Sequence, residues 1–363
     1  MGTTLALPRA AFQWYGVAMR IPLAALAATL CMGGLAHAAV RRFPADAPWT
    51  AGKLSAVTVQ ADGLALAPEA PRGTFAAPRV TFARAYDRLV PSWNARTATG
   101  GRVVIEVRPF RAGAPLSDWL TIARWSKNER GARDAGAGAV TIDQDTVKVA
   151  GGADAVELRA TLERGAGGAP TLQALGVTAF ASDGHTSPEV TSTGGSDIRY
   201  PVPYRSQRDA DRAISGRICG PTSLSMALAY NGVVLKTEEV AALAKDPAGD
   251  IAYGNWAYLA ATAAELGLDA DVRAFGSLDE VVRELAVGHL VILALQFKRG
   301  ELPGAPISQT AGHLVLARGY DADGNIHVND PAGHGPKDGQ VRYARASLAT
   351  AWKRGIGIVL KRF

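Results

Sequence analysis

Apolar and polar residues alternate along the first half of the chain, and such period-two alternation is typical of half-buried β-strands. Gly, Pro, Asp and Asn interrupt the pattern, as in Pro91-Ser92-Trp93-Asn94 and in residues 165–168. The clearest alternating runs are residues 102–108, 140–143 and 156–162. Helical periodicity is nearly absent, so we predict an all-β, sandwich-like domain over residues 39–182.

Residues 183–199 contain few large apolar side chains and are rich in Gly, Ser, Thr and Pro. This composition is typical of a linker between domains. We therefore predict a linker over residues 183–199, and we expect His185 within it to be a solvated loop residue.

After residue 200 the pattern changes to helical periodicity. Good helix formers fill residues 221–231 and 255–266, and Ser277-Leu278-Asp279-Glu280 is a capping box that opens a third helix. Strand-like runs follow at residues 290–296, 313–318, 326–329 and 356–360. Helices that precede an antiparallel sheet favour an α+β domain over residues 200–363 rather than a doubly wound parallel fold.

The N-terminal segment has the pattern of a signal peptide. Arg9 and Arg20 precede an apolar stretch over residues 21–35, which ends in Ala36-His37-Ala38. The apolar stretch is too short to span a bilayer comfortably. We predict that residues 1–38 are a signal peptide and that the mature protein, without a membrane span, is secreted or periplasmic. Translation would start at Met1 or at Met19.

Composition narrows the class of protein. Of the 363 residues, 48% are hydrophobic and 20% are charged, which excludes a disordered or coiled-coil protein. The net charge is +6, but acidic and basic residues are interspersed without a Lys/Arg run, so we expect no nucleic-acid partner. Signal cleavage would remove Cys31 and leave Cys219 unpaired. An unpaired thiol in an exported protein is a candidate reactive group.

Cys219 stands directly before Gly220 and Pro221, at the start of a predicted helix. Proline is favoured at the first helical position, so the cysteine lies at or just before the helix N-terminus. The unpaired N–H groups and the positive end of the helix dipole stabilise a thiolate there. Gly220 would let a substrate backbone approach closely. A buried, inert cysteine is the usual alternative, but the polar residues that flank Cys219 argue against it.

A nucleophilic cysteine needs a base, a group that orients the base, and a donor for the oxyanion. His313 opens an apolar strand, and Asp330 follows the next strand. Antiparallel pairing of these strands would let Asp330 hold one imidazole nitrogen while the other faces Cys219. The side-chain amide of Gln207 suits an oxyanion hole shared with the N–H of Cys219.

The other polar candidates near this site have simpler interpretations. We expect a helix C-cap at His289, a strand residue at His327 and a loop residue at His334, while Asn329 is an alternative orienting group. The sequence lacks a His-Glu-x-x-His or paired-cysteine motif, and the turn over residues 321–325 lacks the glutamate that closes a calcium loop. We therefore predict no metal and no cofactor.

Three tryptophans of the first half, Trp93, Trp119 and Trp125, admit two interpretations. They would form an aromatic face if the domain bound a carbohydrate or a cell-surface ligand. We favour a place in the sandwich core, because a tryptophan buries a large apolar area.

Four stretches together resemble the peptidase C39-like branch of the papain-like cysteine peptidases. They are residues 203–207, 219–226, 312–321 and 329–331. The resemblance covers roughly residues 200–363, and it implies an exported bacterial type with an N-terminal β domain. It also implies Cys219 as nucleophile, His313 as general base, Asp330 as orienting group and Gln207 as oxyanion donor.

From these observations we expect an exported cysteine peptidase that hydrolyses peptide or protein substrates through a thioester. Some peptidases of the resembling family are fused to membrane spans and an ATPase, and they cleave after Gly-Gly. We do not expect this specificity here, because the chain has no phosphate-binding motif and no membrane span beyond its predicted signal peptide. One alternative is an acyltransferase or amidase that uses the same residues. Another is a surface- or carbohydrate-binding protein with a degenerate peptidase fold.

Overall fold

The computed structural model describes residues 38–362 except residues 99, 128, 132, 185 and 190–192. Residues 1–37, which hold Cys31 and nearly all of the predicted signal peptide, lie outside the described residues, as does His185. Within the described chain the strands form two sheets, and every strand pair in them is antiparallel. The first sheet precedes the predicted linker, and the second includes residues 198–199 at the end of that linker.

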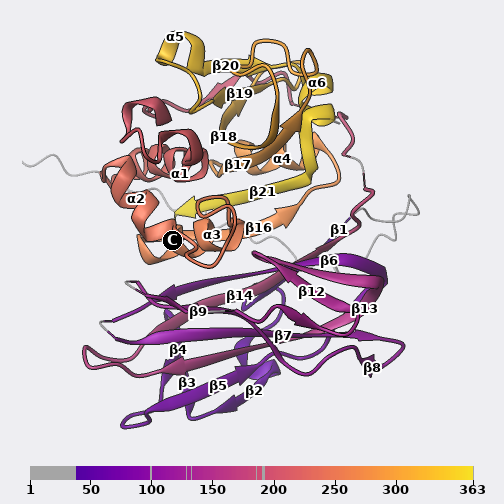
Figure 1. The fold of residues 1–363 in the computed structure, drawn as a ribbon, viewed down its shortest axis with the longest axis vertical. Helices are drawn as coiled ribbons and strands as arrows, with labels where there is room; N and C mark the ends of the chain where they lie inside the picture. The colour runs from indigo at the N-terminus through magenta and orange to yellow at the C-terminus, as the bar shows by residue number, and fades with distance from the viewer. Residues whose placement is uncertain are drawn as a thin grey trace, which may run out of the picture. The chain divides into compact units, whose positions relative to one another are not determined.

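The first sheet contains strands β1 to β14 (Figure 1). Their bounds are β1 Ala38–Phe43, β2 Lys53–Ser55, β3 Val57–Gln60, β4 Gly63–Leu66, β5 Arg72–Ala76, β6 Val80–Arg96, β7 Arg102–Arg111, β8 Ala114–Pro115, β9 Leu120–Trp125, β10 Arg130–Gly131, β11 Gly136–Ala137, β12 Val140–Asp143, β13 Thr146–Glu163 and β14 Thr171–Phe180. The three alternating runs lie in β7, β12 and β13, so the structure confirms these strands.

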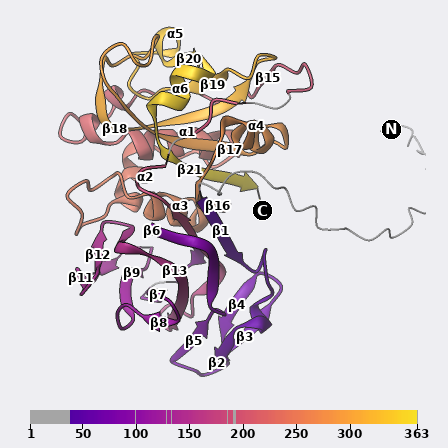
Figure 2. The same ribbon diagram turned by 90° about the vertical axis from the view of Figure 1, so that its right-hand side faces the viewer.

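The two long strands β6 and β13 organise the first sheet, because each changes partners along its length. β13 pairs with β12 and β6 near its start and with β5 and β7 near its end. Its pairing with β6 loses register around Gly151 and Gly152, whose φ angles of 75° and 79° suit glycine. β13 therefore links parts of the sheet whose inward-facing side chains form one core. Figure 2 shows the strong curvature of β6.

β6 runs through Pro91-Ser92-Trp93-Asn94, which we expected to interrupt the strands; that prediction was wrong. The pairing of β6 with β13 covers residues 80–89, and beyond it β6 pairs with β14 alone. Proline lacks an N–H group and is tolerated where one edge of a strand is unpaired. The free edge therefore explains how a strand accommodates Pro91.

The second sheet has the order β16-β21-β17-β18-β19-β20, with β15 paired to β18. The bounds of the elements in this half are β15 Ile198–Arg199, α1 Cys219–Tyr230, α2 Thr237–Ala244, α3 Trp256–Glu265, β16 Leu268–Ala274, α4 Leu278–Ala286, β17 Leu290–Phe297, β18 Thr310–Tyr320, β19 Ile326–Asn329, α5 Pro336–Gly339, β20 Gln340–Tyr343, α6 Arg345–Ala351 and β21 Trp352–Arg362. Every predicted helix and strand of this half is present, whereas α2, α5, α6, β15, β16 and β20 escaped prediction.

Helices cover both faces of the second sheet (Figure 1). Leu314 and Leu316 of β18 pack in a core with α1 and α3, whereas Val315 and Ala317 pack in another core with α4 and α6. A strand that is buried on both faces has this arrangement. The sheet is therefore rigidly enclosed along β18, the strand that carries His313.

The N-terminus of α4 is capped differently from the prediction. Ser277 makes no capping hydrogen bond with its side chain. Instead, the N–H groups of Leu278 and Asp279 donate to the carbonyls of Ser187 and Glu189, at 3.1 and 3.0 Å. The segment between the two sheets thus supplies the first turn of α4 with its hydrogen-bond acceptors.

Helix α3 connects the two halves at both of its ends. The Asp145 carboxylate, in the turn between β12 and β13, accepts the N–H groups of Trp256 and Ala257 at the start of α3. At the other end, Glu265 accepts the N–H of Thr97 at 2.8 Å and the indole N–H of Trp125 at 3.3 Å. Both acidic side chains therefore form hydrogen bonds across the halves.

Between its ends, α3 packs into the core of the first sheet. The ring of Tyr258 lies edge-on to Trp93 and Trp125, with centroid distances of 6.0 and 5.4 Å. Ala257 and Ala261 enter the same core, and Figures 1 and 2 both draw α3 beside β6. A helix of the second half thus completes the hydrophobic core of the first.

Candidate active site

Cys219 is the first residue of α1, and its side chain is half-buried and free of any disulfide. The helix begins two residues earlier than predicted. Pro221 fits there because the N–H groups of the first turn have no partner within the helix. Gly220 packs inward, since a Cβ at this position would lie 2.8 Å from the side chains of both Leu259 and Leu314. Its small size therefore serves helix packing, and the close approach of a substrate stays a prediction.

His313 and Asp330 meet as the strand pattern predicts. β18 and β19 pair in an antiparallel hairpin, with Leu316 opposite Asn329. Nε2 of His313 lies 2.7 Å from Oδ1 of Asp330, and both side chains are at most 5% exposed. The remaining ring nitrogen, Nδ1, is not used by Asp330, and His313 acts on the Cys219 thiol by lowering its pKa.

The Asp330 carboxylate has a fixed orientation because each oxygen has its own donor besides the histidine. The N–H of Ala332 donates to Oδ1 at 2.9 Å, and the hydroxyl of Tyr343 donates to Oδ2 at 2.7 Å. Tyr204 donates its hydroxyl to the backbone carbonyl of Asp330 at 2.9 Å. The carboxylate therefore holds the imidazole in one orientation.

The charges of these groups reinforce one another. Burial opposes the charge on His313, but Asp330 and Cys219 outweigh it and raise the pKa of the imidazole to about 10. Burial also opposes a thiolate, but the hydrogen bond and positive charge of His313 hold the pKa of the Cys219 thiol below its usual value. Burial likewise opposes the Asp330 carboxylate, whose pKa His313 lowers. Near neutral pH these shifts favour a thiolate–imidazolium pair.

Two family models and one solved structure match parts of this chain. Residues 200–356 match the model of the Peptidase_C39 like family, and residues 39–182 match the model of the Peptidase C39 N-terminal domain. The chain belongs to the peptidase C39-like family. Among solved structures, one described as a C39-like peptidase from Bacillus anthracis matches with 18% identity and a TM-score of 0.36. That match covers 46% of this chain and 98% of the other. A search of curated proteins gives no match.

Gln207 of the C39-like domain makes different contacts from those expected of an oxyanion donor. It lies in a short 3-10 turn, Gln207–Asp209, whose start is anchored by a bond from its N–H to the carbonyl of Pro331 at 2.8 Å. Its Nε2 donates to the carbonyl of Ser215, at 2.8 Å, and its Oε1 is buried without a partner. Ser215 begins the turn that leads into Cys219. The amide is thus bonded to the segment before the thiol, and its role as oxyanion donor stays a prediction.

Asn329, the alternative orienting group, forms its hydrogen bonds with residues other than His313. Its Nδ2 donates toward the carbonyl of Val202 at 3.3 Å, on the α1 side of the sheet. Asp330 follows the last residue of β19, and its carboxylate lies 2.7 Å from His313. Asp330 is therefore the residue that contacts the imidazole.

The remaining histidines make local contacts in the C39-like domain. Nδ1 of His289 lies 2.6 Å from Glu284, at the end of α4, and His334 is exposed beside Asp338. His327 is buried, with Nε2 at 3.2 Å from Asp197. These contacts account for their side chains without a role at the thiol.

The tryptophans of the first half do not form a common aromatic surface. Trp93 and Trp125 are buried, with rings edge-on to each other at 5.7 Å. Trp119 is partly exposed and lies under the guanidinium groups of Arg108 and Arg159, at 4.7 and 4.4 Å. Core packing is thus confirmed for two of the three, and an aromatic face made by all three is excluded.

Two tyrosines of the site escaped the sequence analysis. Tyr343 lies in β20, and no local pattern indicates that its hydroxyl reaches Asp330. Tyr204 lies within one of the four resembling stretches, and its ring fills the space that glycine leaves at position 339, where a Cβ would lie 2.1 Å from its hydroxyl. A small residue opposite an aromatic one is the signal that could have revealed this contact.

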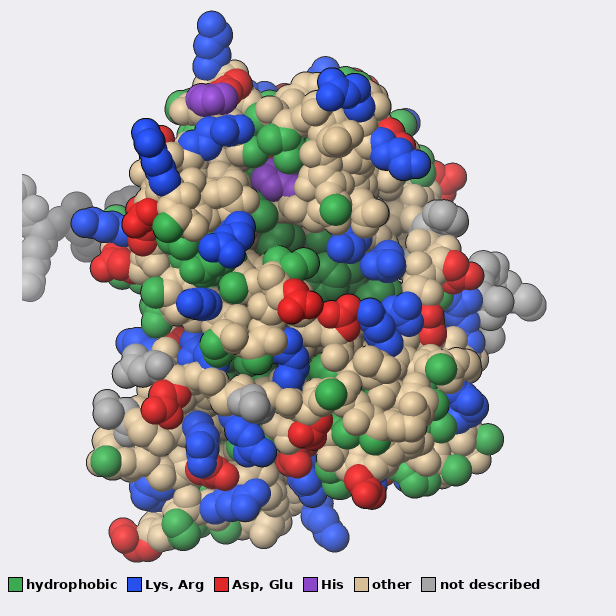
Figure 3. Space-filling model, viewed as in Figure 1, with side chains coloured by type: hydrophobic (Ala, Val, Ile, Leu, Met, Phe, Trp, Pro, Cys, Tyr) green, Lys and Arg blue, Asp and Glu red, His purple; other side chains and the backbone are tan. Residues whose placement is uncertain are grey.

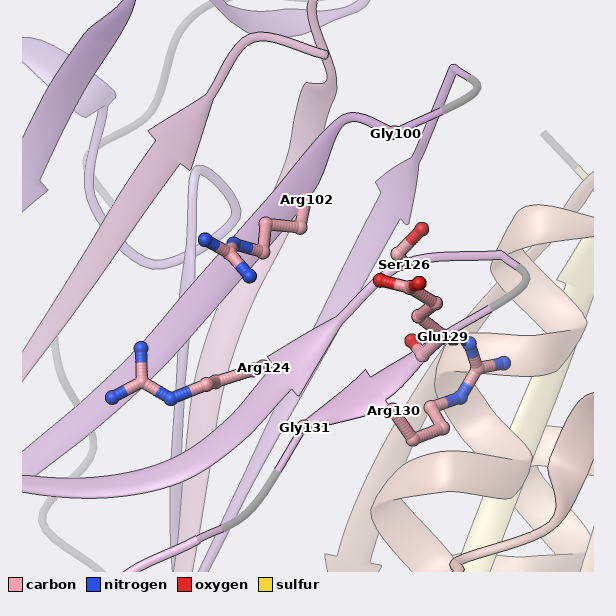
Figure 4. Close-up of a pocket in the computed structure, with 7 residues that line it drawn as sticks. All are labelled: Gly100, Arg102, Arg124, Ser126, Glu129, Arg130 and Gly131. Carbon is pink, nitrogen blue, oxygen red and sulfur yellow. Dashed lines mark hydrogen bonds between the residues drawn. The ribbon is translucent and has the colours of Figure 1, made fainter.

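Two hollows of the surface differ in their relation to the thiol. One, of about 400 Å³, lies in the first half, where Arg102 and Arg124 point away from Arg130 (Figure 4). Its cationic groups do not converge on one point. The other, of about 800 Å³, is lined by the end of β17 and by the starts of β18 and β21. Figure 3 shows a hollow lined by hydrophobic side chains, with a histidine visible, where Figure 1 draws β18.

Within residues 38–362, leaving aside the seven undescribed positions, no group of three or more His, Cys, Asp or Glu side chains is arranged to hold a metal. Over the same residues, no helix has the length and apolar character needed to cross a membrane.

Proposed function

We propose that this protein is a cysteine peptidase that hydrolyses peptide bonds with a papain-like arrangement of Cys219, His313 and Asp330. The observation that carries the proposal is the buried His313–Asp330 pair, which lowers the pKa of the half-buried Cys219 thiol at the start of α1. The base and its orienting group are hydrogen-bonded, and the helix N-terminus favours negative charge on the sulfur of the nucleophile.

The reaction follows from the contacts of these groups. The Cys219 thiolate attacks the carbonyl carbon of a peptide bond, and the N–H groups of the first turn of α1 donate to the oxyanion. His313, held by Asp330, then gives its proton to the leaving amine. Water, deprotonated by His313, attacks the thioester, and the carboxylic acid product leaves. Gln207 would join the oxyanion hole if its amide turned from Ser215 toward the thiol.

We further propose that the enzyme acts outside the cytoplasm. Cleavage after Ala38 would leave β1 nearly complete, since that strand starts at Ala38. An unpaired cysteine then persists in an oxidising compartment because the site, and not a disulfide, requires it.

The rate of Cys219 alkylation by iodoacetamide, measured against pH, tests the proposal. We expect the wild type to react with an apparent pKa well below the free-thiol value of about 8.5, because His313 stabilises the thiolate. The His313→Ala variant should lose this reactive phase, whereas His334→Ala, which changes an exposed histidine, should keep it. A thiol that titrates near its free value in all three proteins would contradict the peptidase mechanism.

A further inference from the structure

The larger recess lies beside the proposed catalytic residues but takes no part in the chemistry above. Thr310 and Ala311 line it, and His313 follows on the same strand. At roughly 3.3 Å per residue, Thr310 lies within about 10 Å of His313 along β18. An extended peptide bound across the thiol would place a side chain two or three residues from the scissile bond at this distance.

Basic side chains dominate the recess. Lys298, Lys353 and Arg354 line it, against one carboxylate, that of Glu301. Glu301 already accepts the N–H of Lys298 at 2.7 Å. Within the described part of the chain, the ammonium groups of Lys298 and Lys353 make no hydrogen bond or ion pair.

The other carboxylates that act on Lys353 also have partners. Asp143 and Asp145 attract its charge from the first half of the chain. Asp143 is paired with Lys148 at 2.6 Å, and Asp145 accepts N–H groups of α3. Half-burial and the neighbouring Arg354 hold the pKa of Lys353 below its usual value. An anion bound in the recess would offset the repulsion between the positive charges of Lys353 and Arg354.

The backbone of β21 presents these cations at a bulge. Leu293 pairs with Gly357 and Leu295 pairs with Trp352, so residues 353–356 leave the ladder with β17, whereas Ile356 still pairs with Ala274 of β16. Arg354 has a φ of 54°, an uncommon conformation for a residue other than glycine, and its Nε donates to the carbonyl of Ser182 at 3.2 Å. Bulges and such backbone strain gather next to functional sites.

We propose that the recess lined by Lys298, Lys353 and Arg354 is a substrate subsite that binds a carboxylate group of the peptide. The carboxylate belongs either to an Asp or Glu side chain or to the C-terminus of the substrate. This inference rests on the proposed peptidase function, since it assigns a preference to the same cleft. Such a subsite makes the enzyme selective for substrate peptides that carry an acidic side chain or a free C-terminus near the scissile bond.

Binding to the Cys219→Ala protein, which cannot turn over, tests the subsite without relying on catalysis. The probes are dansyl-labelled random hexapeptide pools with one position fixed as Glu or Gln, each made with a C-terminal amide or a free acid. We expect the Glu amide pool, the Gln free-acid pool, or both, to bind about tenfold tighter than the Gln amide pool, as one charge-assisted contact gives. Added salt should reduce the difference.

Variants then assign the effect to the recess. Lys298→Glu with Lys353→Glu should abolish the preference, and Lys298→Arg with Lys353→Arg should keep it. Lys53→Glu, which reverses a charge on the exposed strand β2, controls for a charge reversal elsewhere on the surface. A thermal melt of each variant checks folding. Tighter binding of Glu amide supports a side-chain subsite, and tighter binding of the free acid supports a C-terminal one. Equal binding of all pools would overturn the subsite, even where fast Cys219 alkylation upholds the peptidase.

Discussion

The orientation of a single carboxylate decides what the thiol can do. Asp330 is 1% exposed, and its oxygens accept from His313, Ala332 and Tyr343. A buried carboxylate with every donor in place cannot rotate without losing a hydrogen bond. It therefore fixes which nitrogen of His313 faces Cys219.

Replacing Tyr343 by Phe should weaken this orientation. The change leaves Oδ2 of Asp330 buried without its donor, which costs about 1–3 kcal/mol. We expect a lower melting temperature and a rise in the apparent pKa of Cys219 alkylation, because a less firmly held imidazole stabilises the thiolate less. Tyr320→Phe, at another buried tyrosine of the same sheet, is the control and should leave the alkylation profile unchanged. An unaltered profile in Tyr343→Phe would show that Asp330 needs no second donor.

At the scale of elements, α3 is held by acidic side chains at both ends. Asp145 accepts N–H groups at its positive end, as the helix dipole favours. Glu265 reaches Thr97 and Trp125 from the last residue. The loop before α3 packs in turn near α1, where Tyr253 clusters with Ile218. The first sheet thus contacts the start of α1 through α3 and its preceding loop.

Burial makes the Asp145 contact depend on pH. Burial raises the pKa of Asp145 to about 6, although hydrogen bonds from Trp256 and Ala257 oppose the shift. The Asp145 carboxyl group therefore binds its proton more tightly in the folded state than in the unfolded state. The free energy of unfolding gains from this protonation below about pH 4, and the gain is lost as pH rises through about 6. We expect the wild type to gain up to about 3 kcal/mol relative to Asp145→Asn between pH 7 and pH 3.

Urea unfolding of both proteins at several pH values measures this difference. Asp143→Asn, which removes an exposed carboxylate of the same hairpin, controls for the loss of one charge. A constant difference between wild type and Asp145→Asn over the whole range would contradict the linkage.

Local patterns predict local features of this fold, and long-range contacts escape them. Alternation locates β7 and β12, and Pro221 locates the start of α1 to within two residues. Ser277 has the sequence of a helix cap, but carbonyls from residues far along the chain take its place. The direction in which the Gln207 amide points depends on Ser215 and on packing, so no motif indicates it. The same holds for Tyr343, whose partner is set by how β19 and β20 pair.

At the scale of the whole molecule, the halves share hydrophobic cores. Tyr258 and Ala261 of α3 pack among side chains of the first sheet, and Val90 and Phe180 of the first sheet pack in the core around α1. Neither half can bury these residues alone. Burial of apolar surface contributes about 25 cal/mol for each Å². Separating the two halves would expose these side chains to water and lose that stabilisation.

We predict that residues 198–363 expressed without the first half will be aggregation-prone or unfolded. Coexpression with residues 38–184 should restore a soluble complex, because the α3 contacts can form between separate chains. Gel filtration and the alkylation rate of Cys219 measure both outcomes. A soluble fragment that melts cooperatively near the temperature of the full chain would contradict the prediction.

The shared core also sets the order of events during synthesis. The ribosome makes β1 to β14 first, yet their core lacks Tyr258 and Ala261 until α3 has been translated. The nascent first half therefore exposes part of its apolar core to solvent. Its core is complete only after α3, which follows Cys219 in the chain, has been synthesised.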